Sequence, residues 1–386
     1  MKTAIRIPLL ASTVVVSIVV LSDAAAGLSW RAGTGATPTG VTRSVTVSGI
    51  NDRGQIIGNL TTKAGVHHGF VWRRGSLRLL GAQASQINER GQVLGHTQYF
   101  GHDVPALWDN GKRKRLGLSP VFGLNDRGQV LGGKGGAGGD YLRGGSPALW
   151  TDGAIRRLPF LPDWGVAFND VGQVVGETSH RDVGEWQDGH LTELGPGNPI
   201  AINDRGEILG YSQDGDVIVW QNGSAIDIGH GRPIAINDRG EVIWYSDENP
   251  SGPSDTFLWR NGKSTDLGAV AAVAISDSGQ VVGAVENSDG DEYGFVWQSG
   301  HLTRLPPPKG YAGFSTRAVA INDHNQIVGD DLLESQSVRG RSKFAVLWTL
   351  KGGKISTVRI AGRGVGAVVE ARRLQATRSN WGAAGY

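Results

Sequence analysis

The chain has 386 residues, among them 60 Gly and 12 Trp but no Cys. Its 38 Lys and Arg nearly balance its 36 Asp and Glu, which leaves a formal net charge of +2. The lack of Cys excludes disulfides and a thiol nucleophile. The cations are spread along the chain rather than clustered, and this balance gives no indication of a nucleic-acid partner.

Residues 1–26 have the pattern of a secretory signal peptide. Lys2 and Arg6 precede an uncharged, mostly apolar run over residues 7–21, and three alanines follow at 24–26. A charged start, an apolar stretch and small residues at the cleavage site are typical of such leaders. The apolar run is short for a membrane span. We therefore expect cleavage near Ala26, a secreted, extracellular chain, and no stable membrane span afterwards; an uncleaved anchor is the alternative.

Residues 27–42 are rich in Gly and Thr and are expected to form a linker or a segment that helps to close the fold. Residues 43–361 then repeat one turn of the form Asn-Asp-x-Gly eight times, with small variations. The steps between successive turns are 37, 37, 44, 34, 34, 39 and 46 residues, a period that indicates a repeat architecture. The turns begin at Asn51, Asn88, Asn125, Asn169, Asn203, Asn237, Ser276 and Asn322.

Each repeat contains four short apolar runs that read as β-strands, here named a, b, c and d. In the fifth repeat they are residues 199–202, 207–210, 217–220 and 224–229. The Asn-Asp-x-Gly turn joins strands a and b, and Asn-Gly or Asp-Gly joins c and d in most repeats, which is a strong hairpin signal. Every repeat carries one Trp at the end of strand c, at positions 72, 108, 150, 186, 220, 259, 297 and 348. We expect these Trp side chains to pack between neighbouring repeats.

A small four-stranded sheet cannot bury both of its faces, so neighbouring repeats must stack. Four-stranded units of about 40 residues are typical of β-propeller blades. The sequence therefore predicts an all-β chain that folds as an eight-bladed β-propeller of antiparallel sheets. A linear β-solenoid is the alternative. Residues 362–386 no longer follow the repeat and are expected to form a tail, either a short helix or disordered.

The repeated phrase resembles the HAF family of probable extracellular repeats. The resemblance is clearest over residues 201–210, Ala-Ile-Asn-Asp-Arg-Gly-Glu and its continuation, and over residues 257–268, and it covers most of residues 45–360. It implies export and a propeller-like repeat, with no established activity. The turns also resemble the integrin-type FG-GAP repeat, but each offers about one Asp where Ca²⁺ needs several oxygen ligands. We expect no metal and no other cofactor.

The connections between strands b and c vary most in length. From the last residue of strand b to the Trp of strand c the separations are 14, 13, 18, 10, 10, 15, 14 and 19 residues. In an antiparallel meander the b–c and d–a connections lie on one face, here called the variable-loop face, and the a–b and c–d turns lie on the other, here called the turn face. Binding residues concentrate in variable loops on a rigid scaffold. The candidate ligand-binding residues are Tyr99, His102, Tyr141, Trp164, His180, Arg181, Asp182, Asp289, Asp291, Tyr293 and Tyr311.

We expect a monomer that binds a protein or an extracellular or cell-wall glycan through its variable-loop face, without catalytic residues. The alternative is a hydrolase or lyase that acts on polysaccharide with loop carboxylates and His. His180, Arg181 and Asp182 could serve such chemistry, although solvated loop residues are the simpler interpretation. No nucleophile elbow, zinc motif or phosphate loop occurs in a suitable context.

Overall fold

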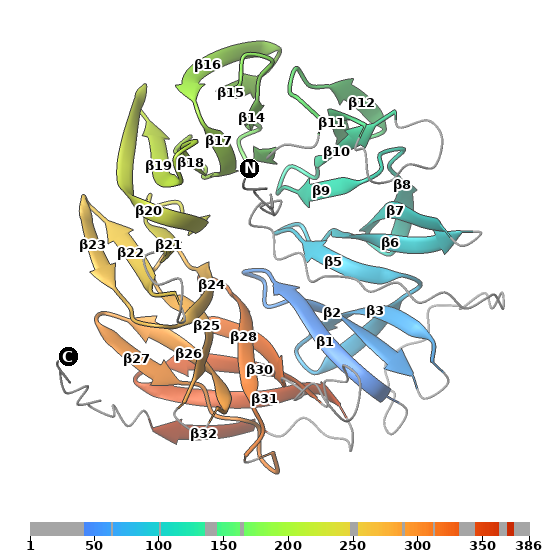
Figure 1. The fold of residues 1–386 in the computed structure, drawn as a ribbon. Helices are drawn as coiled ribbons and strands as arrows, with labels where there is room; N and C mark the ends of the chain where they lie inside the picture. The colour runs from blue at the N-terminus through green and yellow to red at the C-terminus, as the bar shows by residue number, and fades with distance from the viewer. Residues whose placement is uncertain are drawn as a thin grey trace, which may run out of the picture.

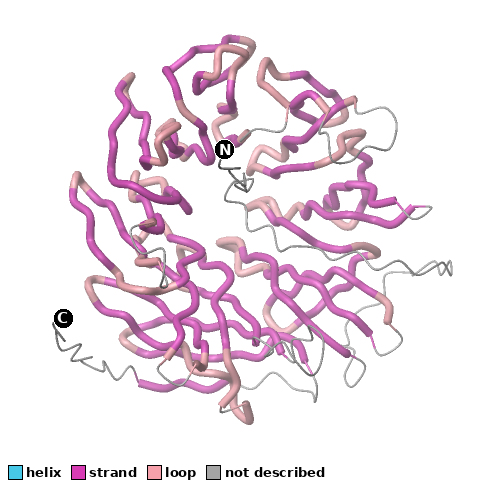
Figure 2. Tube along the Cα trace, viewed as in Figure 1, coloured by secondary structure: helices cyan, strands magenta, loops and turns pink. Residues whose placement is uncertain are grey.

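The computed structural model describes residues 42–62, 65–99, 102–135, 145–162, 166–247, 254–287, 290–311, 313–331, 344–362 and 369–373. The expected signal peptide and the segment 27–41 lie outside the described residues. The described chain consists of strands and the turns and loops that join them (Figure 2).

The strands form seven hydrogen-bonded antiparallel sheets, mostly of four strands each in chain order. The first three sheets contain β1 (Thr42–Ile50), β2 (Ile56–Thr62), β3 (His67–Arg73) and β4 (Ser76–Leu80); β5 (Gln83–Ile87), β6 (Val93–Tyr99), β7 (His102–Asp109) and β8 (Lys112–Arg115); and β9 (Val121–Leu124), β10 (Val130–Lys134), β11 (Ser146–Thr151) and β12 (Ala154–Arg157). The fourth contains β13 (Ala167–Phe168), β14 (Val174–Glu177), β15 (Asp182–Gln187) and β16 (His190–Pro196).

The fifth sheet has seven strands because β20 belongs to two consecutive repeats. It contains β17 (Asn198–Ile202), β18 (Ile208–Tyr211), β19 (Asp216–Gln221), β20 (Ser224–Ile236), β21 (Val242–Ser246), β22 (Thr256–Arg260) and β23 (Lys263–Asp266). Residues 224–230 of β20 pair with β19, whereas residues 231–236 pair with β21. The chain thus passes from strand d of the fifth repeat into strand a of the sixth without a break in pairing.

The last two sheets complete the molecule. They contain β24 (Ala271–Ile275), β25 (Val281–Glu286), β26 (Glu292–Gln298) and β27 (His301–Arg304); and β28 (Thr316–Ile321), β29 (Gln326–Asp331), β30 (Phe344–Lys351), β31 (Lys354–Gly362) and β32 (Val369–Arg373). Strand β32 adds a fifth strand to the outer edge of the last sheet. Residues 369–373 of the tail therefore form a strand, where the sequence suggested a short helix or disorder.

The sheets are arranged radially around a central axis, with each strand a innermost, so the molecule is β-propeller-like (Figure 1). The core is divided among clusters that span neighbouring repeats. Ile200 and Leu209 of the fifth repeat, for example, pack with Val242 and Trp244 of the sixth. The apolar faces of each sheet are therefore buried against the next, as the stacking argument predicts.

The first and last sheets close the ring. Val47 of β1 and Val328 of β29 belong to one apolar cluster. The backbone N–H of Val47 also donates to Oδ2 of the buried Asp330, at 3.3 Å, and the guanidinium of Arg317 contacts Oδ1 of Asp330 at 2.9 Å. Burial raises the pKa of the Asp330 carboxyl, and Arg317 opposes that rise. The seam between chain ends is thus held by apolar contacts and by a buried carboxylate.

Both predicted hairpin turns are present. In the a–b turn of the fifth repeat, Gly206 N donates to Asn203 O at 3.0 Å and Gly206 takes a φ of 78°. The c–d turns have two consecutive residues at positive φ, such as Asn222 at 50° and Gly223 at 74°, as type I′ hairpins require. Strand a carries a register shift in most sheets, for example between Pro199 and Ala201, which the sequence pattern did not indicate.

The repeat Trp side chains lie in the core, buried in seven of the eight repeats. Strand b carries a Gly at its third position because the neighbours leave no room: a Cβ on Gly210 would clash with Asn198 O and lie 2.9 Å from the Trp220 ring. In the sixth repeat this Gly is replaced by Trp244, which is buried and stacks on Phe257 at 5.3 Å. The repeat Trp there, Trp259, is only half-buried. Trp244 thus takes over the role of core aromatic.

We expect Gly206→Val to lower the free energy of unfolding by at least about 1 kcal/mol, because a β-branched side chain is strained at positive φ. A Cβ there would also lie 3.2 Å from the Gln173 side chain. Urea unfolding followed by Trp fluorescence measures the change. The matched control is Asn325→Gly, in the one a–b turn where Asn instead of Gly takes the positive φ, 59°; it should be neutral or slightly stabilising. Equal stability of Gly206→Val and wild type would contradict the turn assignment.

Candidate functional site

The eight a–b turns form a closed ring of hydrogen bonds on the turn face. The Asn that opens each turn first organises its own turn: Oδ1 of Asn203 accepts from Glu207 N at 2.9 Å, and Nδ2 donates to Glu207 Oε2 at 2.6 Å. The same Nδ2 donates to Asn237 O in the next turn, at 2.9 Å. Seven of the eight turns make this link, including the one from Asn322 Nδ2 to Asn51 O at 2.9 Å between the last and first repeats; the turn that opens with Ser276 does not.

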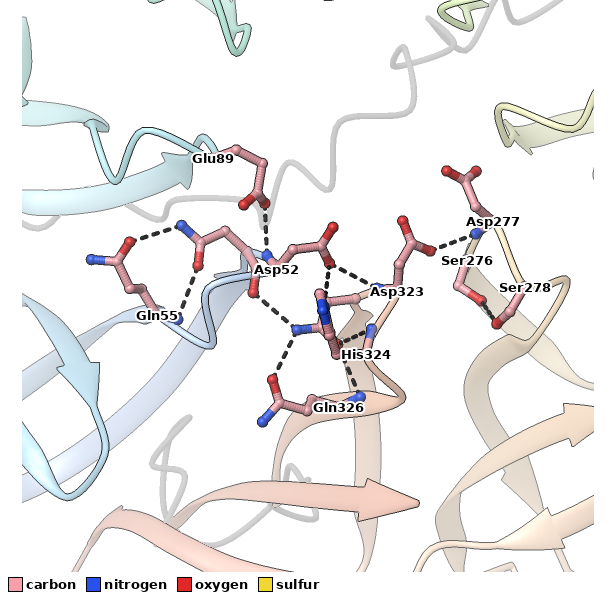
Figure 3. Close-up of polar contacts among 11 residues, drawn as sticks. Asp52, Gln55, Glu89, Ser276, Asp277, Ser278, Asp323, His324 and Gln326 are labelled. Atoms are coloured by element: carbon pink, nitrogen blue, oxygen red, sulfur yellow. Dashed lines mark hydrogen bonds and ion pairs between the residues drawn. The ribbon is translucent and has the colours of Figure 1, made fainter. Parts of the chain in front are cut away.

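A second circle of hydrogen bonds runs through the acidic residue that follows each Asn or Ser. The backbone N–H of Asp204 donates to Oδ1 of Asp238 in the next turn, at 2.8 Å, and every turn repeats the contact. Figure 3 shows the closing segment, where Asp277 N donates to Asp323 and Asp323 N donates to Asp52, each at 2.8 Å. The carboxylates are Asp52, Glu89, Asp126, Asp170, Asp204, Asp238, Asp277 and Asp323.

Several carboxylates of this ring have raised pKa values. Burial raises the pKa of Asp170 to about 6; the hydrogen bond from Asp126 N–H opposes the rise, and the neighbouring carboxylates add to it. Burial likewise raises the pKa of Glu89, Asp238 and Asp323, with repulsion from adjacent acids contributing in each case. The acids therefore serve first as acceptors that link turns, at an electrostatic cost.

A cavity of about 290 Å³ lies among the innermost strands of the second to sixth repeats. Its lining residues include Phe122, Phe168 and Ile202, but more of the wall surface is polar than apolar. Four of its lining residues, at positions 124, 168, 202 and 236, directly precede ring turns. The carboxylate ring therefore borders one end of this cavity.

The variable-loop face carries different polar groups in each repeat. In the fourth repeat, Nδ1 of His180 lies 2.9 Å from Oε1 of Glu193. In the fifth, Nδ1 of His230 lies 3.1 Å from Oδ1 of Asp216. Both His side chains are more than half exposed, at 72% and 51%. The hydrogen bond that His180 donates to the Glu193 carboxylate raises the pKa of His180, so this His keeps its charge to a higher pH than an isolated His.

Arg181 and Asp182 have distinct roles beside this pair. Arg181 takes a φ of 69°, and its guanidinium donates to Oε1 of Glu177 at 3.0 Å. Glu177 is almost fully buried, and its Oε2 has no hydrogen-bond partner among the described residues. Asp182 begins β15 and contributes to the raised pKa of His180. Arg181 therefore compensates a buried carboxylate instead of being a simple solvated loop residue.

The other candidate residues that the structure describes lie in different sheets. Tyr99 and His102 oppose each other at the end of the β6–β7 hairpin. The Tyr293 ring lies 4.4 Å from the guanidinium of Arg304, and the Asp291 N–H donates to Asn287 Oδ1 at 2.8 Å. Tyr141, Trp164 and Asp289 lie outside the described residues.

Tyr311 is half-buried within an aromatic cluster. Its ring centroid lies 4.6 Å from that of Phe344, and its hydroxyl accepts from Arg359 at 2.9 Å. Its position between the last two sheets indicates a role in packing.

Several polar residues of this face were missed from the sequence. They are Glu177, Glu193, Asp216, His230, Arg232 and Asp247. One of these pairs could have been predicted from the sequence. Asp216 and His230 lie at similar distances along the chain from the Asn222-Gly223 turn, so they face each other in the register of that hairpin. Arg232 and Asp247, 3.3 Å apart, come from strands on either side of a different turn.

Over the described ranges, no three His, Asp or Glu side chains come together as metal ligands would. The same ranges contain no helix that is long and apolar enough to cross a membrane.

No protein-family model matches the chain, and no curated protein matches its sequence. Among solved structures it is similar to the Pyrococcus horikoshii acylaminoacyl peptidase, with a TM-score of 0.47 and 13% identity over 76% of this chain and 58% of the peptidase. It is also similar to the tricorn protease, with a TM-score of 0.37 and 12% identity over 81% of this chain and 41% of the protease. The chain thus spans about half of these proteins' length.

The Aleuria aurantia lectin, solved with Fucα1-6GlcNAc, matches with a TM-score of 0.27 and 10% identity over 89% of this chain and all of the lectin.

Ser276 is the one turn-opening residue that lacks an amide, and its turn therefore lacks the Nδ2 link to the next turn. We expect Ser276→Asn to raise the free energy of unfolding by about 1 kcal/mol, the usual net contribution of a buried hydrogen bond, by restoring a donor to Asn322 O. Thermal unfolding measures the gain. The control Ser276→Ala removes the Oγ that accepts from Gln280 N at 3.3 Å and should be destabilising. A destabilising Ser276→Asn would contradict the ring geometry.

We expect Asp170→Asn to stabilise the fold at pH 7 to 8. Because the folded-state pKa of Asp170 is raised from 3.8 to about 6, wild type loses stability as pH rises through that window. The full shift corresponds to roughly 3 kcal/mol, which partial exposure reduces to about 1 kcal/mol. Asn keeps an oxygen for Asp126 N–H, whereas the control Asp170→Ala does not. Unfolding free energies from pH 4 to 8 test this; an unchanged slope in Asp170→Asn would contradict it.

Proposed function

We propose that this chain is a secreted, non-enzymatic β-propeller of eight blades that binds a protein or an extracellular or cell-wall glycan through its variable-loop face. The count of eight is supported by the double pairing of β20, which serves two consecutive repeats and merges their sheets into one. It is also supported by the eight turns in the closed ring.

The observation that carries the proposal is the contrast between the two faces. On the turn face, the repeated Asn and acidic side chains are engaged by neighbouring turns, so their recurrence has a structural reason. On the variable-loop face, consecutive repeats present exposed and different groups: the His180–Glu193 and Asp216–His230 pairs and the Arg232–Asp247 pair. Groups of this kind can donate to and accept from hydroxyls, amides and carboxylates of a ligand.

Export is supported by the pattern of residues 1–26, and relationship to the HAF repeats by the repeated phrase itself. The chain acts as a monomer in this proposal, because the closed ring leaves the repeat array without open ends. The candidate residues Tyr99, His102, Tyr141, Trp164, Asp289, Asp291 and Tyr293 would extend the binding face around His180 and Asp182.

The experiment measures binding of the mature chain to a glycan array and to isolated cell-wall fractions. His180→Ala and His230→Ala should each weaken capture by about ten-fold while the melting temperature is unchanged, since exposed substitutions cost little stability. The matched control is His324→Ala. This His is also exposed, at 67%, and lies 3.6 Å from Asp52, but on the turn face, so its loss should not affect binding.

Arg181 is not substituted in this test, because its removal would leave the buried Glu177 carboxylate without its ion-pair partner. Equal losses in all three His variants would contradict the assignment of the binding face. Release of new reducing ends from a captured polysaccharide would favour the alternative of a hydrolase or lyase.

A further inference from the structure

The outermost strands of the first three repeats carry a concentration of cations. Strand β8 reads Lys-Arg-Lys-Arg, β12 ends in two Arg, and the hairpin that leads into β4 contributes three more. We call this surface the basic rim; it consists of Arg73, Arg74, Arg78, Lys112, Arg113, Lys114, Arg115, Arg156 and Arg157. These residues come from three separate segments of the chain, and folding places their strands at the outer edge of successive sheets (Figure 1).

The cations of the basic rim lie at the surface of the molecule. All of them are exposed except Lys114, which is half-buried. Lys114 contacts Asp109 at 3.1 Å and Asp152 at 3.8 Å, the two acids of the neighbouring c–d turns. Within the described chain, Arg73, Arg74, Lys112 and Arg113 form no ion pair. The local acids are therefore neutralised by one Lys, and the surface keeps a strong positive charge.

The basic rim is continuous from one sheet to the next. A Cβ on Gly111, in the β7–β8 turn, would lie 3.1 Å from an Arg78 guanidinium nitrogen, so Arg78 reaches the second hairpin. Gly117, just after β8, lies next to Ile155 of β12. The guanidinium of Arg156 covers the Trp186 ring of the fourth repeat at 5.6 Å. Neighbouring hairpins thus present their cations side by side.

Protection of exposed strand edges does not account for this charge. Charged residues on an edge strand prevent edge-to-edge association, but one or two are enough. The corresponding outer strands of later repeats carry fewer cations: β16 has no Lys or Arg, β23 has one Lys, β27 has one Arg, and β32 has two Arg and a Glu. A structural requirement shared by all repeats would not concentrate cations on the first three and leave β16 without a Lys or Arg.

We infer that the basic rim binds a linear acidic polysaccharide. Side chains two apart on a strand lie about 6.7 Å apart on the same face, which sets Lys112 with Lys114 and Arg113 with Arg115. Such rows match regularly spaced carboxylate or sulfate groups, and guanidinium groups bind these anions with two parallel hydrogen bonds. This surface is separate from the variable-loop face, so the inference does not rest on the function proposed above.

Other polyanions fit the described surface less well. Single-stranded nucleic acids are held by exposed aromatic side chains on which bases stack, whereas Trp72, Trp108 and Trp150 of these repeats are buried. Membrane surfaces are held by apolar anchors in addition to charge. Leu79, at 41% exposure, is the one large hydrophobic residue counted as exposed on the β4, β8 and β12 strands.

The test measures binding of the mature chain to heparin and to polygalacturonate, with neutral dextran as a negative control. Arg78→Gln, Lys112→Gln and Arg113→Gln combined should weaken binding to the acidic polymers by about ten-fold or more. The matched control combines Lys263→Gln, Lys309→Gln and Lys351→Gln, three exposed cations elsewhere, with the same change in net charge. It should shift binding less than about two-fold, and higher salt should weaken binding of wild type.

Absence of binding to both acidic polymers, or equal losses in the two triple variants, would overturn the inference. Tighter binding to duplex DNA or to vesicles containing phosphatidylglycerol, lost in the same rim variant, would overturn the choice of partner. The His180→Ala variant should bind heparin as wild type does. Failure of this prediction and failure of the variable-loop proposal are therefore distinguishable.

Discussion

The fold depends on the Asn side chain that opens most a–b turns, because it forms hydrogen bonds both within its own turn and to the next turn. The Asn that opens a turn bonds the backbone of its own turn and, through Nδ2, the carbonyl of the next turn. Only a short side chain with both an acceptor and two donor hydrogens can do this, which is why Asp or Ser cannot fully replace it. Seven of the eight turns make this link, and the contact from Asp277 N to Asp323 completes the circle at Ser276, so each turn is held from both sides. The arrangement explains why a chain without Cys needs no disulfide to join its first and last sheets.

The hydrogen bonds of the turn face also bear on which surfaces are free to bind a partner. The acids next to the Asn residues accept backbone hydrogen bonds from neighbouring turns, and burial, together with repulsion between adjacent acids, raises several of their pKa values. Their recurrence is thus explained by linkage between repeats, even though a ring of carboxylates would by itself suggest a binding site. Chemistry that differs between repeats is found elsewhere, in the paired groups of the variable-loop face and in the basic rim. A repeat protein reveals its recognition surfaces through such departures from symmetry.

Some repeats also depart from the shared sequence pattern in the core, in a turn or at the seam, and these departures affect how the sheets are held together. Trp244 replaces the Gly at the third position of strand b, and the repeat Trp of that sheet is less buried as a result. Ser276 keeps only part of the Asn network. Asp330 and Arg317 form a polar contact at the seam between the last and first sheets. These two sheets are not consecutive along the chain. Each departure is local because neighbouring turns still hold the affected repeat in place.

The sequence by itself determined the strands, both hairpin turns and the stacking of repeats, because these follow from short-range rules: positive φ at Gly206, Asn-Gly between apolar runs, and one Trp per repeat. It also indicated that the two faces differ. Only the tertiary structure decided which side chains meet. The Nδ2 link from Asn203 to Asn237 spans 34 residues, the buried Glu177 depends on Arg181, and the basic rim exists because three outer strands lie side by side. These contacts depend on the register of the strands and on the lengths of the loops. The sequence of a single repeat specifies neither of them.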